Sequence, residues 1–251
     1  MSKNRIFPPW SEINKFKVPL MPGERFLAEY LDKNLPEDWK IFLKSVLDWG
    51  GAGKTPDIVI SHKTKGIMII EVKDIDLKAY SREPFKNKYG KIRQMFCTFK
   101  NGKKIPIKDP INQIEDYKEL MMEEIPEIID FAYDDKDYEI PIIGGLYFHL
   151  PYSKNRANKI LKYYNKNDLI IFDRNDLNNS EVSKIIPNLN LDNPKLKNSD
   201  WFTKFDNWIM PPLHRVEDGI NLSFNVKQKR YIDPKENTRQ KLAGVAGSGK
   251  T

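Results

Sequence analysis

Two short apolar runs separated by a polar turn constrain the fold of this chain more than any other feature. The first run, DIVIS, spans residues 57–61, and the second, GIMIIEVK, spans residues 66–73. Runs of this length, rich in β-branched residues and bounded by turn signals, are typical of buried strands. The polar HKTKG turn between them predicts that the two strands form a β-hairpin.

Acidic residues stand at the ends of both runs. Asp57 opens the first predicted strand and Glu71 lies near the end of the second. A hairpin brings the start of one strand beside the end of the next, so the two carboxylates are expected at one edge of the sheet. Lys73 shares a strand face with Glu71 because side chains alternate with period two. The alternative is that Glu71 and Lys73 form an ordinary ion pair on an exposed strand.

Two carboxylates beside a lysine suit a particular chemistry. Mg²⁺ is a hard ion that takes oxygen ligands and keeps several waters, so two acids and a substrate phosphate can hold it. Such an ion can polarise a phosphodiester, and a nearby lysine can orient the attacking water or offset negative charge. The pattern therefore indicates a phosphodiesterase site that uses Mg²⁺ or Mn²⁺.

The remaining periodic segments predict a mixed α/β domain. Helices are expected at residues 21–35, 109–125 and 153–164, and further strands at 39–49, 140–150 and 168–173. The order helix, three strands, helix, strand implies a mixed sheet flanked by helices. From about residue 186 the sequence becomes rich in Asn, Pro and Lys, which is typical of a linker or accessory region.

Two stretches contain Gly-Lys-Thr, the last three residues of a phosphate-binding P-loop motif. In GGAGKTPD, residues 50–57, the position of the first P-loop glycine is taken by Asp48, and a strand follows instead of a helix. This copy is therefore predicted not to bind nucleotide. AGVAGSGKT fits the pattern and predicts the opening of a truncated ATPase, which would bind ATP in a complete parent protein. Its candidate nucleotide-binding residues are Gly244, Gly249, Lys250, Thr251 and, upstream, Gln228.

The segment from Arg82 to Lys108 is strongly basic and is predicted to be rich in turns. Its aromatic residues alternate with cations, which favours a nucleic-acid surface over the alternative of a hydrated loop. The whole chain has 251 residues and a formal net charge of +7, consistent with a polyanionic partner. The candidate DNA contacts in this segment are Lys86, Lys88, Lys91, Arg93, Lys103 and Lys104.

Several motifs together resemble one family of nucleases. PDIVI at residues 56–60, GIMIIEVKD at 66–74, Gly23-Glu24 and DPINQ at 109–113 are similar to the nuclease-related domain family, NERD, of the PD-(D/E)xK nuclease superfamily. The resemblance covers roughly residues 22–150 and the last thirty residues. It implies a restriction-endonuclease-like core, and a domain that often precedes a UvrD-like superfamily 1 helicase, as the terminal P-loop would suggest.

The resemblance also implies roles for individual residues. Asp57 and Glu71 would bind the metal, and Lys73 would serve the attacking water. Glu24 would be a helix-borne acid that completes the metal site, with Glu29 as the competing candidate. The alternative for Glu24 is an acid in the first turn that is favoured by the helix dipole. Gln113 and Tyr117 would occupy the place where related nucleases carry a Q-x-x-x-Y element near the scissile strand, which makes Gln113 a candidate catalytic residue and Tyr117 a candidate DNA contact.

These observations lead to one main hypothesis and two alternatives. Residues 1–186 are predicted to form a Mg²⁺- or Mn²⁺-dependent DNA nuclease domain, 187–221 a linker, and 222–251 the start of a helicase domain, with phage defence or DNA repair as the setting. The alternatives are an inactive module that delivers DNA to the helicase and a pure assembly platform, and a homo-oligomer is left open. The single cysteine, Cys97, favours a reducing cytoplasm, and no apolar run is long enough for a membrane span.

Overall fold

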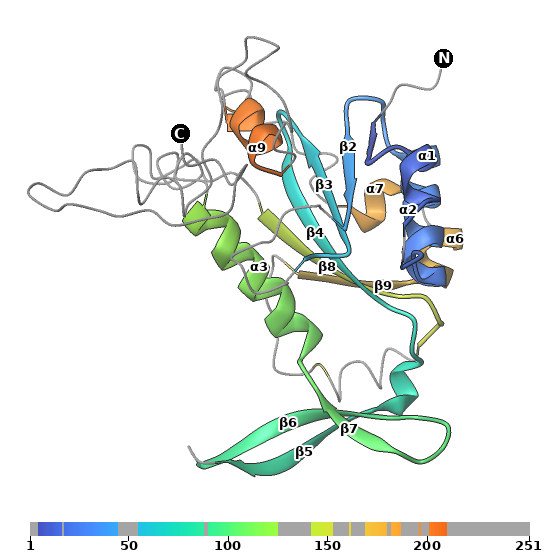
Figure 1. Ribbon diagram of the computed structural model, residues 1–251, viewed down its shortest axis with the longest axis vertical. Coiled ribbons are helices and arrows are strands. Elements are labelled where there is room, and N and C mark those ends of the chain that lie inside the picture. The colour runs from blue at the N-terminus through green and yellow to red at the C-terminus, as the bar shows by residue number, and fades with distance from the viewer. Residues whose placement is uncertain are drawn as a thin grey trace, which may run out of the picture.

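A six-stranded mixed sheet forms the centre of the protein in the computed structural model (Figure 1). The structure describes residues 5–16, 18–44, 55–87, 90–124, 142–152, 161, 169–179, 182–186, 196 and 201–209. The strand order is β1-β2-β3-β4-β8-β9, in which β2, β3 and β4 are antiparallel neighbours and the other pairs are parallel. The strands are β1 (Ile6–Phe7), β2 (Lys40–Leu43), β3 (Ile58–His62), β4 (Gly66–Lys73), β8 (Ile142–Phe148) and β9 (Leu169–Asp173). The predicted mixed α/β class is confirmed.

The predicted hairpin is the pair β3 and β4. Ile58 lies opposite Ile70, and the pairing continues to His62 opposite Gly66. Nearly every residue of both strands is buried, which is why the runs are continuously apolar and do not alternate. The strand predicted over residues 39–49 is shorter in the structure, where β2 ends at Leu43. Residues 45–50 lie outside the described part of the chain.

Helices cover both faces of the sheet (Figure 1). One face packs against α2 (Pro22–Asn34) and three short helices. The short helices are α1 (Trp10–Ile13), α6 (Arg174–Asn179) and α7 (Val182–Ile185). The other face packs against α3 (Pro110–Glu124) and α9 (Trp201–Ile209). Period two divides the hairpin between them: Ile58, Ile60, Met68 and Ile70 face α2, whereas Val59, Ile67 and Ile69 face α3 and α9.

The basic segment forms a second sheet, so the prediction of a turn-rich stretch was wrong. After the short 3-10 helix η2 (Leu77–Ala79) come three antiparallel strands, β5 (Tyr80–Asn87), β6 (Gly90–Thr98) and β7 (Lys104–Ile107). This sheet projects beyond the first turn of α3 (Figure 1). Tyr80 and Met95 anchor it in a cluster with Ile111 of α3 and Phe148 of β8. Pro84 and the many lysines dilute the apolar alternation by which strands are recognised in sequence.

Part of the predicted linker or accessory region is a packed helix. Trp201 and Phe205 of α9 are fully buried against the sheet, and the Trp201 indole N–H donates to the Lys63 carbonyl at 3.1 Å. Asp206 forms an ion pair with Lys40 of β2. The accessory segment therefore supplies part of the core, while the boundaries predicted at residues 186 and 221 stay predictions. The helix predicted at 153–164 lies outside the described residues except for Leu161.

None of the helices described is both long and apolar enough to cross a membrane. The longest of those named above, α3, carries several charged residues along its 15 residues. This observation agrees with the absence of a long apolar run in the sequence.

The packing of α9 gives a direct test of its place in the core. Phe205→Ala is expected to lower the free energy of unfolding by about 3–5 kcal/mol, because it opens a cavity against Phe42 and Trp201. Thr203→Ala is the matched control on the exposed face of the same helix and should change it by less than about 0.5 kcal/mol. Urea denaturation of both variants measures the difference. Equal, small effects would mean that α9 does not contribute to the core.

Candidate functional site

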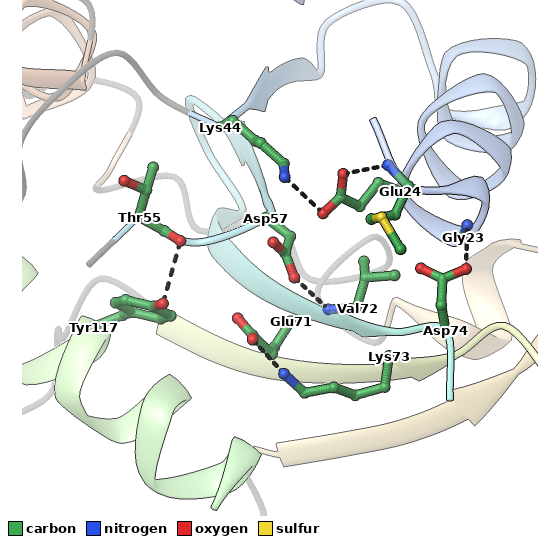
Figure 2. Close-up of polar contacts among 11 residues, drawn as sticks. Gly23, Glu24, Lys44, Thr55, Asp57, Glu71, Val72, Lys73, Asp74 and Tyr117 are labelled. Carbon is green, nitrogen blue, oxygen red and sulfur yellow. Dashed lines mark hydrogen bonds and ion pairs between the residues drawn. The ribbon is translucent and has the colours of Figure 1, made fainter. Parts of the chain in front are cut away.

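Asp57 lies just before β3 and is held between two neighbouring strands (Figure 2). Its Oδ2 accepts a hydrogen bond from the Val72 N–H of β4 at 2.8 Å. Its main-chain carbonyl accepts from the Lys44 N–H, directly after β2, at 3.1 Å. Both the backbone and the carboxylate of Asp57 are therefore fixed by the sheet.

Glu71 and Lys73 form a buried pair on β4 and not an exposed one. Glu71 is 4% exposed, and its Oε1 accepts a hydrogen bond from the Lys73 Nζ at 2.6 Å. Its Oε2 is buried and has no hydrogen-bond partner among the residues that the structure describes. A buried carboxylate oxygen without a hydrogen bond is costly, because it loses its contact with water and gains no protein donor in return. The surface-pair alternative does not fit this burial.

Gln113 and Tyr117 approach the pair from α3, one helical turn apart. The Lys73 Nζ donates to the Gln113 Oε1 at 3.3 Å. The Tyr117 hydroxyl donates to the Thr55 carbonyl at 3.2 Å, and a side-chain hydrogen bond joins Tyr117 to Gln113. Tyr117 is only 4% exposed. The structure thus places Gln113 in the site, and Tyr117 beneath the segment that leads into Asp57.

The electrostatics of the site favour a proton on Asp57. The pKa of Asp57 is raised to about 8, first by burial and second by the nearby Glu71 carboxylate. The Val72 N–H and the Lys73 ammonium act in the opposite direction, while Glu24 contributes a further, smaller increase. The Glu71 carboxylate is therefore close enough to oppose the ionisation of Asp57.

Glu24 is the helix acid near Asp57, although its carboxylate is already engaged. Its Oε2 accepts from the Met21 N–H at 2.8 Å in a capping interaction at the start of α2, and its Oε1 pairs with the Lys44 Nζ at 2.9 Å. The competing candidate, Glu29, has a side chain that is 57% exposed and pairs with Arg25 at 3.7 Å. The structure therefore places Glu24 by the site and Glu29 on the surface.

Gly23 explains why α2 begins so close to β4. The Gly23 N–H donates to the Asp74 Oδ1 at 2.7 Å. A Cβ at this position would lie 2.9 Å from that oxygen and 2.9 Å from the His149 Cβ, so only glycine fits without displacement. Sequence reasoning did not give a role to Asp74 or Lys44. Asp74 ends the quoted GIMIIEVKD run, whereas nothing local marks Lys44.

The other predicted binding residues are placed only in part. Lys103 is exposed near the β6–β7 turn; Lys104 pairs with Glu83 and lies 5.0 Å from the Phe96 ring centroid. The strand β3 follows Thr55 closely, as expected if GGAGKT is not a P-loop. Outside the described part lie residues 45–54, the side chains of Lys86, Lys88, Lys91 and Arg93, and the candidate nucleotide-binding residues Gln228, Gly244, Gly249, Lys250 and Thr251.

Asp57 and Glu71 fit a divalent metal that completes its coordination from elsewhere. Within the described residues, no group of three or more His, Cys, Asp or Glu side chains is arranged to hold a metal. The two carboxylates, one of which has an oxygen without a hydrogen bond in the described structure, are nevertheless of the type that a hard ion takes together with substrate phosphate and water. The free cysteine, Cys97, is buried in the second sheet and lies outside this arrangement.

Comparison with known protein families places this site inside one domain type. Residues 20–149, just over half of the chain, match the family described as nuclease-related domain, NERD. Comparisons with curated proteins and with solved structures give no match. The matched region contains Glu24, Asp57, Glu71, Lys73 and Gln113, and it does not extend to the terminal AGVAGSGKT.

The raised pKa of Asp57 predicts how stability depends on pH. The folded protein holds the Asp57 proton more tightly than the unfolded chain, so this contribution is complete below about pH 3.8 and is lost as pH rises through about 8. Asp57→Asn mimics the neutral form and preserves an acceptor for the Val72 N–H. In EDTA, the variant should melt about 2 °C or more above the unmodified protein at pH 8.5, with little difference at pH 4.

Thermal melts at both pH values check this expectation. Asp38→Asn, at an exposed position after α2, is the control for a general effect of removing one negative charge. If the Asp57 variant shows the same difference in melting temperature at both pH values, the carboxylate does not titrate as described.

Proposed function

The chain belongs to the nuclease-related domain (NERD) family, and from this premise we propose that it is a Mg²⁺- or Mn²⁺-dependent nuclease that hydrolyses phosphodiester bonds in DNA. The observation that carries the proposal is the convergence of Asp57, Glu71 and Lys73 at the ends of β3 and β4. The buried Glu71 Oε2, which has no hydrogen-bond partner among the described residues, is the feature that an ordinary structural ion pair would not need.

In this proposal Asp57 and Glu71 are the protein ligands of the ion. When bound, the ion would polarise the phosphodiester and lower the pKa of a coordinated water. Asp57 would give up its proton on binding, because its carboxylate coordinates in the ionised form. The Oε2 of Glu71, which has no hydrogen bond within the described structure, would gain a contact with the ion.

Lys73 has a separate role, which is to balance charge on the phosphate. Its ammonium is held between Glu71 and Gln113, so it is oriented before substrate arrives. A preoriented cation stabilises the negative charge that develops during the reaction at little reorganisation cost. Gln113 is a positioning residue for Lys73, and Tyr117 positions the Thr55 segment that leads into Asp57.

The polyanionic substrate is supported by charge. The chain carries 42 Lys and Arg against 35 Asp and Glu, and the second sheet holds a dense group of the cations. An inactive DNA-binding module is the alternative function, since the same cations would serve it. This alternative gives no reason for the pairing of the half-buried Asp57 with the buried Glu71 at the end of the hairpin.

The setting of the reaction is a further proposal. The P-loop pattern AGVAGSGKT at residues 243–251 supports a nuclease domain that works beside an ATP-driven helicase, with ATP as the nucleotide of the helicase. Phage defence and DNA repair both use such a pairing, and the single cysteine agrees with a cytoplasmic location.

Two variants separate the roles of the carboxylate and the lysine. Asp57→Asn should weaken Mn²⁺ binding as well as DNA cleavage, because it removes a ligand charge. Lys73→Met should leave Mn²⁺ affinity unchanged or slightly higher and should lower the cleavage rate by a factor of about 10². Calorimetric Mn²⁺ titration and a plasmid-nicking assay measure the two effects on the same preparations.

Lys33→Gln is the control, because Lys33 is exposed in the last turn of α2 and carries the same charge as Lys73. Equal loss of Mn²⁺ by both site variants would contradict the division of roles. Full cleavage by both variants would exclude this site as the nuclease centre, and DNA binding without any metal-dependent cleavage would favour the inactive module.

A further inference from the structure

Lys44 lies on the opposite side of Asp57 from Lys73 (Figure 2). It directly follows β2, and its main-chain N–H donates to the Asp57 carbonyl. Its Nζ pairs with the Glu24 Oε1 at 2.9 Å. Asp57 therefore stands between two lysine–glutamate pairs, Lys73 with Glu71 on the α3 side and Lys44 with Glu24 on the α2 side.

The backbone of Lys44 adopts an unfavourable conformation. Its φ is 37°, in the left-handed region, and no other non-glycine residue in the described part of the chain has a positive φ. Side chains with a Cβ rarely adopt this region, and strained residues of this kind cluster at functional sites. Glycine would adopt this φ without strain, but it would lack the ammonium group that Lys44 supplies.

The contacts of Glu24 suit an anchor better than a metal ligand. One carboxylate oxygen caps α2 through the Met21 N–H, and the other holds the Lys44 ammonium. Glu24 is 5% exposed, whereas the Lys44 side chain is 34% exposed. The buried acid thus fixes a cation that solvent, and a ligand, can reach.

The chemistry of Lys44 fits a phosphate. An ammonium group has three N–H donors, so an ion pair with one carboxylate oxygen does not exhaust it. Three carboxylates, those of Glu24, Asp57 and Glu71, surround the site against two ammonium groups, Lys44 and Lys73. The carboxylates repel a polyanionic backbone that approaches this edge, and the ammonium groups of Lys44 and Lys73 offset that repulsion from two sides of Asp57.

We propose that Lys44 is a substrate-binding residue that contacts a backbone phosphate of the nucleic acid, with Glu24 as its buried anchor. This inference rests on the proposed function, because it takes a nucleic-acid strand as the substrate. It assigns Glu24 to the orientation of Lys44 and leaves metal binding to Asp57 and Glu71. Lys44 and Lys73 then hold the strand from two sides.

Binding of a short fluorescein-labelled DNA duplex, measured by anisotropy in EDTA over a range of salt concentrations, tests the proposal. Lys44→Gln should weaken binding about tenfold at low salt and reduce the slope of log affinity against log salt by about 1. Lys44→Arg keeps the charge and should restore most of the affinity. Lys33→Gln removes an equal charge from exposed surface and should change neither quantity appreciably.

Lys44→Gly provides a second variant in case glutamine is not tolerated at this position. Glycine accepts the φ of 37° without strain and still removes the ammonium group. It should bind DNA as weakly as Lys44→Gln while its circular dichroism spectrum matches that of the unmodified protein. With Mn²⁺ present, both variants should show a raised KM for cleavage and a smaller change in kcat.

Glu24→Gln separates the anchor from a metal ligand. Its Mn²⁺ affinity should stay within about twofold of the unmodified protein, because a lost carboxylate ligand would cost far more. A tenfold or larger loss of Mn²⁺ affinity would overturn the role given to Glu24. If the unmodified protein binds DNA and the Lys44→Gln variant binds it with the same affinity as the Lys33→Gln variant, the role given to Lys44 is wrong but the proposed function stands. If the unmodified protein binds no DNA, the proposed function fails with it.

Discussion

Strands β3 and β4 pair from Ile58 opposite Ile70 to His62 opposite Gly66, and this register determines where the charged groups of the site stand. Asp57 is one residue before the first pair, which brings it beside Glu71. Period two then puts Glu71 and Lys73 on the face of Ile67 and Ile69, toward α3. A slip of one residue would turn both charges toward α2 and the apolar cluster around Leu27. Burial on both faces makes that slip costly, so the same apolar contacts that stabilise the sheet also align the site.

Such an arrangement concentrates carboxylates where water is scarce. Burying an ionised group without compensation is expensive, and the protein compensates with specific donors. The Val72 N–H serves Asp57, the Met21 N–H serves Glu24, and lysines serve Glu24 and Glu71. What is left uncompensated appears as the raised pKa of Asp57 and, within the described part of the chain, as a Glu71 Oε2 without a hydrogen-bond donor. The strands that align the site therefore leave two of its polar groups incompletely compensated.

The sequence predicted those features that depend on local pattern. The hairpin follows from two apolar runs and a polar turn, and the meeting of Asp57 with Glu71 follows from hairpin geometry. Gln113 was found only through the resemblance of DPINQ to the family, because a glutamine in a helix has no distinctive pattern. The strands β5 to β7 were missed because Pro84 and a dense run of cations hide their alternation. Helix α9 was missed because an Asn- and Pro-rich neighbourhood obscured its two buried aromatic residues.

Lys44 and Asp74 could not be found in this way, because tertiary contacts alone give them their positions. The hydrogen bond from Gly23 to Asp74 joins residues 51 apart in sequence, and the φ of Lys44 has no signature in its neighbours. These contacts also give the Gly23-Glu24 pair a structural explanation. The glycine is required by the close approach of Asp74 and His149, and the glutamate by an N-terminal cap and a lysine. An acid that resembles a metal ligand in sequence therefore has two other partners in the structure, the Met21 N–H at the start of α2 and the Lys44 ammonium.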